Sequence, residues 1–399
     1  MGLRRIVRGY RRRSLFTLVF GPLRVYTAKG GRRKCLLISL RVMIRPVIVG
    51  TGSYIPTERV ENARFMKHDF WGADGKRIDK SNQDILEQFQ AITGIRERRY
   101  VRDDQVTSDI AYEAARDALD SSGVDPESLD YLIVAHNFGD VRAGGRHSDL
   151  VPALAARVKA KLQIKTPRTV AIDYIFGCPG WLQGMITAGS MMRAGDIRRA
   201  MVIGAETLSR VSDPHDRDSL IYSDGAGATI IEAVDTEAQV GILAHTVRSD
   251  TLEHSSMLAM GKTYNEDAFL EALFLKMEGR KVYRYAVSTV AAAMKDCLQR
   301  AGVELHDVKK VLIHQANGKM DEAILSTLYS LNGKREPPAD VMPMTISWLG
   351  NSSVATVPTL LDLILKKKLD GHQIGSGDVL VFASVGAGMH INAAVYRVP

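Results

Sequence analysis

The chain has 399 residues, of which 45% are hydrophobic and 25% charged, a composition typical of a folded globular protein and not of a disordered one. Its net charge of +8 is unevenly spread: residues 1–42 contain ten Arg, two Lys and no acidic residue, so they carry +12 and leave −4 for the rest. This distribution excludes a nucleic-acid-binding domain, and the short apolar runs, all below the roughly 20 residues of a membrane span, exclude a membrane protein.

The basic segment 1–42 is predicted to lie outside the fold. It is explained by a true start at Met43, by a targeting presequence, or by a basic arm. Three cysteines, Cys35, Cys178 and Cys297, are too few and too scattered for a disulfide framework, and no CxxC pair suggests zinc. We therefore expect no bound metal and a cytoplasmic location, or an organellar one if residues 1–42 are a genuine targeting signal.

From residue 46 onward, short β-branched runs alternate with longer helical stretches, a pattern typical of layered α/β proteins. In chain order it predicts strand 47–49, helix 108–122, strands 131–134 and 169–172, helix 180–194, strand 200–203, helix 285–301, strand 308–313, helices 320–329 and 354–367, and strand 379–382.

One helix-loop-strand unit occurs twice. A single shift of 179 residues lays 115–139 over 294–318 without a gap, although few positions are identical and chance similarity stays open. A second pairing supports duplication, because Gly177-Cys178 and Gly350-Asn351 each stand before a predicted helix. We therefore divide the chain into a first half, 43–235, which carries the cysteine, and a second half, 236–399.

Cys178 is the first candidate catalytic residue. It follows the predicted strand 169–172 and precedes Pro179-Gly180, where proline suits a first helical turn. A thiol at a helix N-terminus faces unpaired N–H groups and the positive end of the helix dipole, which favour the nucleophilic thiolate. Taken alone, Cys178 is more readily interpreted as a small buried hydrophobe.

His314 and Asn351 are the candidate partners of this thiol. His314 ends the predicted strand 308–313, at the carboxyl edge where α/β proteins place their sites, although taken singly it is equally interpretable as a structural histidine. Asn351 precedes a predicted helix and is interpretable as an N-cap, but the adjoining Gly350 also permits a close backbone approach. The last strand runs into the loop 386–388, a glycine loop that could turn backbone N–H groups toward a carbonyl oxygen.

Together these motifs resemble β-ketoacyl-acyl-carrier-protein synthase III, a condensing enzyme of the thiolase superfamily. The resemblance runs from about residue 46 to residue 397, and it is specific because several motifs recur in the family's order. They are Thr93-Gly94-Ile95-Arg96, Gly177-Cys178, Ser223-Asp224-Gly225-Ala226-Gly227, His314-Gln315-Ala316-Asn317, Gly350-Asn351-Ser352-Ser353 and Gly386-Ala387-Gly388.

The resemblance implies a duplicated, five-layered αβαβα thiolase-like fold and, usually, a homodimer. It also implies a two-step reaction in which Cys178 takes an acyl group from a thioester. A malonyl-acyl-carrier protein then loses CO2 with His314 and Asn351 on its carbonyl, and the enolate attacks the acyl-cysteine. The backbone N–H groups of Cys178 and Ala387 are expected to form the oxyanion hole.

By the same resemblance, Met277, Gly279 and Asn317 match positions along the pantetheine tunnel. Arg217 matches a residue near the nucleotide end of coenzyme A, and Lys319 matches a basic residue suited to docking the acyl carrier protein. No cofactor is expected to be tightly bound, because acyl-CoA and acyl-carrier protein are substrates. For Arg217 and Lys319, ordinary surface charge is the alternative.

The sequence departs from the family pattern near Thr93. Gln88 and Ile92 stand where the typical chain-initiating enzyme has a Trp and an Arg that hold the CoA adenine, which puts acetyl-CoA priming in doubt. A specialised condensing enzyme that makes alkyl-aromatic, quinolone or long-chain head-to-head products is therefore a rival hypothesis. A thioester hydrolase with the same Cys and His is a second rival, and a non-catalytic carrier-binding subunit is a third.

Overall fold

The computed structural model describes residues 43–268 and 271–399. The predictions made for residues 1–42, including Cys35, lie outside the described residues.

A five-stranded mixed sheet forms from the first part of the chain. Its order is β1-β7-β6-β4-β5, with β4 parallel to both β5 and β6 and with β7 antiparallel to β6 and β1. The strands are β1 (Met43–Tyr54), β4 (Tyr131–Ala135), β5 (Val170–Tyr174), β6 (Arg199–Thr207) and β7 (Asp224–Thr236).

A four-stranded sheet of order β11-β12-β13-β8 forms from the later part. Its parallel pair, β11 and β12, continues into antiparallel β13 and β8. The strands are β8 (Gly241–Ser249), β11 (Val308–Ile313), β12 (Val379–Gly386) and β13 (His390–Arg397).

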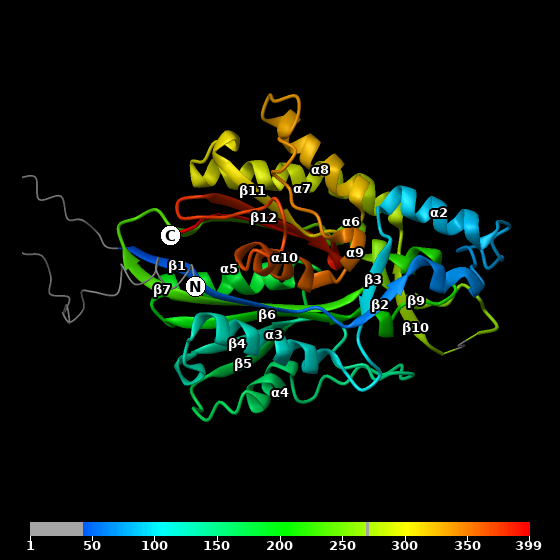
Figure 1. Ribbon diagram of the computed structural model, residues 1–399, viewed down its shortest axis with the longest axis horizontal. Helices are drawn as coiled ribbons and strands as arrows, with labels where there is room; N and C mark the ends of the chain where they lie inside the picture. Colours follow the sequence, from blue (N-terminus) through cyan, green and yellow to red (C-terminus); the bar gives the residue numbers. More distant parts are fainter. Residues whose placement is uncertain (1–42, 269–270) are drawn as a thin grey trace, which may run out of the picture.

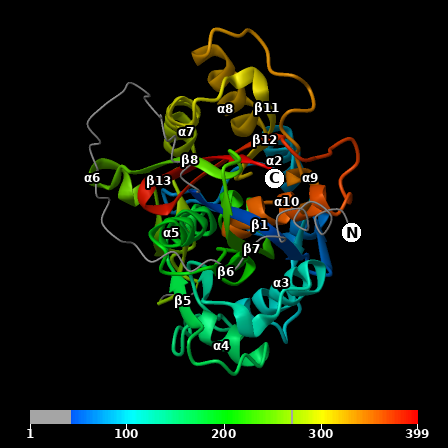
Figure 2. The same ribbon diagram turned by 90° about the vertical axis from the view of Figure 1, so that its left-hand side faces the viewer.

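Helices separate and cover the two sheets, so that the molecule has five layers (Figures 1 and 2). Two helices pack between the sheets and contact strands of both, namely α5 (Gly180–Ala194) and α10 (Thr356–Leu365). The outer face of the five-stranded sheet carries α3 (Thr107–Ser122) and α4 (Leu154–Lys161). The outer face of the four-stranded sheet carries α7 (Gly279–Ala301) and α8 (Gly318–Leu331).

Smaller elements gather at one end of the layers (Figure 1). They are the antiparallel pair β2 (Glu58–Glu61) and β3 (Glu97–Tyr100), helix α2 (Asn82–Thr93), helix α6 (Thr251–His254), hairpin β9 (Leu258–Lys262) and β10 (Leu273–Met277), and helix α9 (Ile346–Leu349).

The predicted repeat is visible as matching elements. Helices α3 and α7 end at Ser122 and Ala301, 179 residues apart, and each is closed by a left-handed glycine with nearly the same backbone angles, Gly123 (φ 62, ψ 27) and Gly302 (φ 62, ψ 35). A short 3-10 turn and a buried parallel strand follow in both places.

Several boundaries differ from the prediction for steric reasons. The strand expected at 47–49 extends from Met43 to Tyr54. Its second half contains glycines because α3 packs closely on it: a Cβ on Gly52 would lie 2.3 Å from the Ala114 carbonyl oxygen of α3. The helix expected at 354–367 begins at Thr356, since Ser353 has a left-handed φ of 53°. Strands β7, β8 and β13, and helices α2 and α4, were not predicted.

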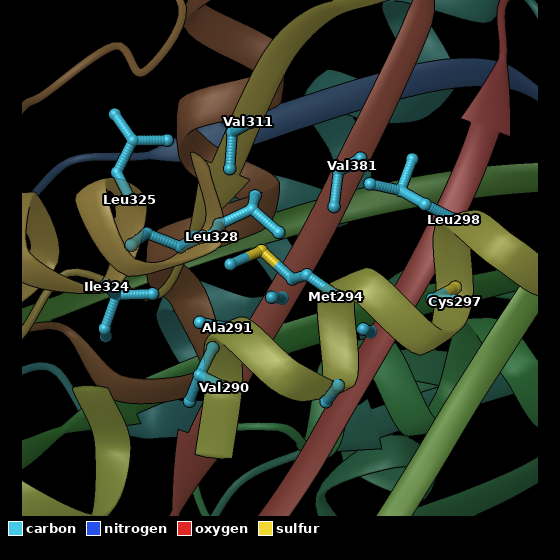
Figure 3. Packing of buried hydrophobic residues seen from close by; sticks show 14 of the residues in the cluster. Val290, Ala291, Met294, Cys297, Leu298, Val311, Ile324, Leu325, Leu328 and Val381 are labelled. Carbon is cyan, nitrogen blue, oxygen red and sulfur yellow. The ribbon is translucent and has the colours of Figure 1, made fainter. Parts of the chain in front are cut away.

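The core over the four-stranded sheet shows why α7 forms where it does (Figure 3). Val290, Met294 and Cys297 follow one another at three- and four-residue spacing and lie on one buried face of the helix. That face packs on α8, through Leu328, and on β8, β13 and β12 of the four-stranded sheet. Met294 has no exposed surface, so its side chain fills the space between these layers.

We predict that Met294→Ala lowers the free energy of unfolding by about 2–5 kcal/mol, because it removes a fully buried side chain and leaves a cavity. The matched variant Met294→Leu keeps the volume and costs less than about 1.5 kcal/mol. Thermal unfolding of the two variants measures the difference. Equal melting temperatures would contradict the packing described for α7.

Candidate active site

Cys178 lies in the tight turn that joins β5 to α5. Its neighbour Gly177 has a left-handed φ of 61°, and a Cβ there would lie 2.7 Å from the backbone N of Ala387. From the other side, a Cβ on Gly386 would lie 2.3 Å from the backbone N of Cys178. Only glycines permit this contact. The end of β12 therefore lies directly against the cysteine turn, so the backbones of Cys178 and Ala387, the two residues expected to form the oxyanion hole, lie close together.

His314 lies at the carboxyl end of β11, where its backbone N–H donates to the carbonyl of Ala383 at 2.9 Å. Burial lowers the pKa of its ring to about 4, and the nearby Ser353 backbone only partly opposes this effect. The imidazole is therefore neutral at physiological pH. Its Nδ1 is buried without a hydrogen-bond partner in the described part of the chain.

Asn351 is fixed by its own backbone. Its N–H donates to Ile221 at 2.9 Å and its carbonyl accepts from Ser223 at 2.8 Å. The side-chain Oδ1 accepts from the Ser353 N–H at 2.9 Å, which sets the orientation of the amide. No described residue accepts a hydrogen bond from Nδ2, so this donor is left for a ligand. The residue is not the N-cap of α10, which begins only at Thr356.

The predicted catalytic residues line one cavity of about 340 Å³. Cys178, His314, Asn351 and Ala387 all contribute to its wall, although they come from four separate segments of the chain. The structure therefore brings together every residue that the sequence assigned to the chemistry.

The predicted ligand-binding residues line a second, adjoining cavity of about 740 Å³. Arg217, Met277, Gly279 and Asn317 are in its wall, and Met277 is shared with the cavity that holds Cys178. Gln88 and Ile92 of α2 line the same mouth. Asn317 also accepts a hydrogen bond from the Met320 N–H at 3.2 Å and so caps α8.

Lys319 is separate from these cavities. It is exposed in the first turn of α8, and neither lining includes it. This position leaves Lys319 available at the surface beside the mouth residue Asn317.

The environment of Cys178 differs from the sequence expectation. Burial raises the pKa of its thiol to about 11, the charge of Glu206 acts in the same direction, and a hydrogen bond from Ser353 opposes the shift. A helix N-terminus contributes about 0.3–1 kcal/mol, less than one pKa unit. The expectation that this position favours the thiolate is therefore wrong for the free enzyme, because desolvation is the larger effect.

Three residues around Cys178 were not predicted from the sequence. Ser353 donates from Oγ to the Cys178 Sγ at 3.4 Å, and Asn137 and Glu206 lie behind it. Glu206 carried a detectable signal, because it is an acidic residue three positions after the end of the apolar strand 200–203. Ser353 lies inside one of the family motifs but was given no role.

The described ranges offer neither a metal centre nor a membrane span. Across 43–268 and 271–399, no group of three or more His, Cys, Asp or Glu side chains is placed to hold a metal ion. No helix in those ranges is long and apolar enough to cross a membrane.

Comparison with known proteins agrees with this architecture. Residues 172–251 match the family model described as 3-oxoacyl-[acyl-carrier-protein (ACP)] synthase III, and residues 298–398 match its C-terminal counterpart. The β-ketoacyl-[acyl-carrier-protein] synthase III of Erythrobacter litoralis is 34% identical over 358 residues, which cover 89% of this chain and all of that protein. The corresponding protein of Sphingopyxis alaskensis is 33% identical over 355 residues, covering 89% and 99%.

Solved structures give the same result. The 3-oxoacyl-[acyl-carrier-protein] synthase III of Aquifex aeolicus superposes with a TM-score of 0.72 at 26% identity, covering 89% of this chain and 99% of that one. The Pseudomonas aeruginosa enzyme gives 0.71 at 27%, covering 89% and 98%. The fold is that of a thiolase-like condensing enzyme, as predicted. The chain belongs to the 3-oxoacyl-[acyl-carrier-protein] synthase III family.

We predict that alkylation of Cys178 by iodoacetamide still accelerates between pH 8 and pH 10. The reason is that the thiolate fraction grows up to a pKa of about 11. Peptide mass spectrometry measures the rate, and Cys178→Ala is the control for modification elsewhere. A plateau below pH 8 would show that the thiol is already ionised there.

Proposed function

We propose that the protein condenses an acyl thioester with malonyl-acyl-carrier protein through an acyl-Cys178 intermediate and releases CO2 and a 3-oxoacyl thioester. The observation that carries this proposal is the single cavity that holds Cys178, His314, Asn351 and Ala387. Family membership supplies the reaction class, and the cavity supplies the residues.

In the first step, the sulfur of Cys178 attacks the carbonyl carbon of the acyl thioester and expels the donor thiol, which takes up the cysteine proton. The negative charge that develops on the carbonyl oxygen faces the backbone N–H groups of Cys178 and Ala387, which the glycine contact brings together.

In the second step, the carbon–carbon bond to the malonyl carboxylate breaks, CO2 leaves, and the electron pair forms an enolate. The enolate carbon then attacks the acyl carbonyl, and Cys178 departs as a thiolate that takes up a proton. Its raised pKa of about 11 makes this protonation favourable at physiological pH.

His314 and Asn351 suit the enolate because both are neutral donors. The pKa of His314, lowered to about 4 by burial, leaves a neutral ring whose Nε2 is assigned to the thioester oxygen. Asn351 adds its unpaired Nδ2. A carboxylate in place of Asn351 would oppose the developing negative charge, whereas the amide stabilises it.

The finer assignments around the mouth are proposals of the same kind. Met277, Gly279 and Asn317 are assigned to the pantetheine arm, and Arg217 to the nucleotide end, on their shared cavity. Lys319 is assigned to carrier-protein docking on its exposure beside that mouth. The cytoplasmic location stays a prediction from cysteine usage.

The mouth also bears on the acyl donor. Ile85, Phe89 and Ile92 of α2 line it with apolar surface, and Gln88 and Ile92 occupy the places where the typical chain-initiating enzyme has the Trp and Arg that hold the CoA adenine. We therefore propose acyl donors longer than acetyl, or carried on a protein, and the specialised condensing enzyme is the second candidate on this observation.

The proposed function predicts a mass increase on the Cys178 peptide after incubation with an acyl-CoA or acyl-carrier protein, and a 3-oxoacyl product once malonyl-carrier protein is added. Cys178→Ala gives neither. Free acid without a condensation product would identify a hydrolase, and no adduct from any donor of a chain-length panel would contradict the catalytic proposal.

In the same assay, Asn351→Asp retains acylation but slows malonyl decarboxylation by about a hundredfold, because a donor is replaced by a charge.

We further propose a homodimer formed along β5. This strand is an edge of its sheet, and its outward residues are apolar: Val170 is 41% exposed, Ile172 40%, and the following Ile175 61%. An unpaired apolar edge is a template for pairing with another copy. The strand runs directly into the turn of Cys178, so a second copy on β5 would also support the nucleophile.

We predict that Ile172→Arg converts the dimer into a monomer in sedimentation experiments, because it places a charge in the middle of this edge. Leu331→Arg lies at the exposed end of α8, on the outer face of the other sheet, and is the control for an added charge elsewhere. A wild-type protein that sediments as a monomer at micromolar concentration would refute the dimer.

A further inference from the structure

A buried carboxylate lies behind the nucleophile and has no part in the reaction steps. Glu206, at the end of β6, has no exposed surface, and burial raises its pKa to about 7. Within the described part of the chain, Asn137 is its hydrogen-bond donor. Asn137 donates from its backbone N at 3.1 Å and from Nδ2 at 2.6 Å to the same oxygen, Oε2.

Asn137 links this carboxylate to the catalytic turn. Its Nδ2 lies 3.2 Å from the Ser353 Oγ, and that hydroxyl in turn lies 3.4 Å from the Cys178 Sγ. Asn137, Ser353 and Cys178 all line the cavity of about 340 Å³. A continuous chain of hydrogen bonds therefore runs from Glu206 to the reacting sulfur.

The direction of these hydrogen bonds is fixed by the chemistry of their ends. Ionised Glu206, the form that predominates above its pKa of about 7, only accepts, so the atom of Asn137 that faces it must be Nδ2 and not Oδ1. The second hydrogen of Nδ2 points to Ser353, whose oxygen accepts it. The hydroxyl hydrogen of Ser353 is then left for the sulfur of Cys178.

The backbone of Ser353 is held in an unfavourable conformation to make this contact. Its φ of 53° lies in the left-handed region, which is strained for a residue with a Cβ. The neighbouring Asn351 side chain holds it there by accepting its N–H at 2.9 Å. Glycine would adopt this conformation without strain, but it has no hydroxyl to donate.

We propose that Glu206, Asn137 and Ser353 form a positioning relay that holds the Ser353 hydroxyl as a donor to the Cys178 sulfur. This inference deepens the proposed function and rests on Cys178 as its nucleophile. The donated hydrogen stabilises the thiolate both when Cys178 attacks the acyl donor and when it leaves the condensation product. Ser353 is the contact to sulfur, and Asn137 and Glu206 act only through it.

The two ends of the relay have opposite effects on the thiol. The Ser353 hydrogen bond lowers the pKa of Cys178, whereas the negative charge of Glu206 raises it. This opposition gives a signature that general damage to the site would not produce, because removing the donor and neutralising the carboxylate shift the thiol in opposite directions.

The test is the pH profile of Cys178 alkylation by iodoacetamide, followed by peptide mass spectrometry. Ser353→Ala slows alkylation at pH 8 by about tenfold, the loss expected for one hydrogen bond to a charged group. Glu206→Gln keeps an acceptor for Asn137 but removes the charge, so alkylation accelerates. Asn137→Ala frees the hydroxyl to rotate and slows alkylation by less than Ser353→Ala does.

Ser353→Gly is the matched control for strain. It lacks the hydroxyl and suits the left-handed backbone, so it melts at a higher temperature than Ser353→Ala while showing the same slow alkylation. Wild-type rates in both Ser353 variants would overturn the relay, and a wild-type rate in Asn137→Ala would remove Asn137 from it. These results are independent of acyl transfer, because failure of the wild-type enzyme to form an acyl-Cys178 adduct contradicts the proposed function and not the hydrogen bond.

Discussion

The site depends on one backbone contact, the approach of the Gly177-Cys178 turn to the Gly386-Ala387 turn. Each glycine lies where a Cβ would be within 2.7 Å of the opposite backbone. The first turn follows a strand of the five-stranded sheet, and the second follows a strand of the four-stranded sheet. The packing of the two sheets around α5 and α10 therefore places the backbones of Cys178 and Ala387 close together, with no side chain between the two turns.

Burial then gives the groups at this contact their chemical character. It lowers the pKa of His314, and it raises those of Cys178 and Glu206. The cavity therefore holds a neutral imidazole and a neutral thiol, and the Glu206 carboxyl behind them is about half ionised at pH 7. Such a cavity has few fixed charges to compete with a substrate carbonyl. The donors that remain, the Asn351 amide and the backbone N–H groups, are oriented before any ligand arrives, which is the condition for electrostatic stabilisation without reorganisation.

The sequence predicted the layered fold and the three polar residues, because strand and helix periods are local and the motifs occur in a fixed order. Helix 180–194 and strand 308–313 were predicted with their observed ends. The antiparallel strands β7 and β13 were missed, since glycines and small residues there reflect contact with helices from distant parts of the chain. The raised pKa of Cys178 was missed for a related reason: desolvation depends on every surrounding segment, whereas the helix dipole is visible locally.

The glycine contact also determines where this protein can change its substrate without losing its chemistry. Positions 177 and 386 accept no larger residue, so sequence drift and directed evolution are both confined to the periphery. Helix α2 and the hairpin β9–β10 border the cavities but take no part in the contact between the two turns. They form an adaptable rim around a rigid centre, and the unusual Gln88 and Ile92 lie in that rim.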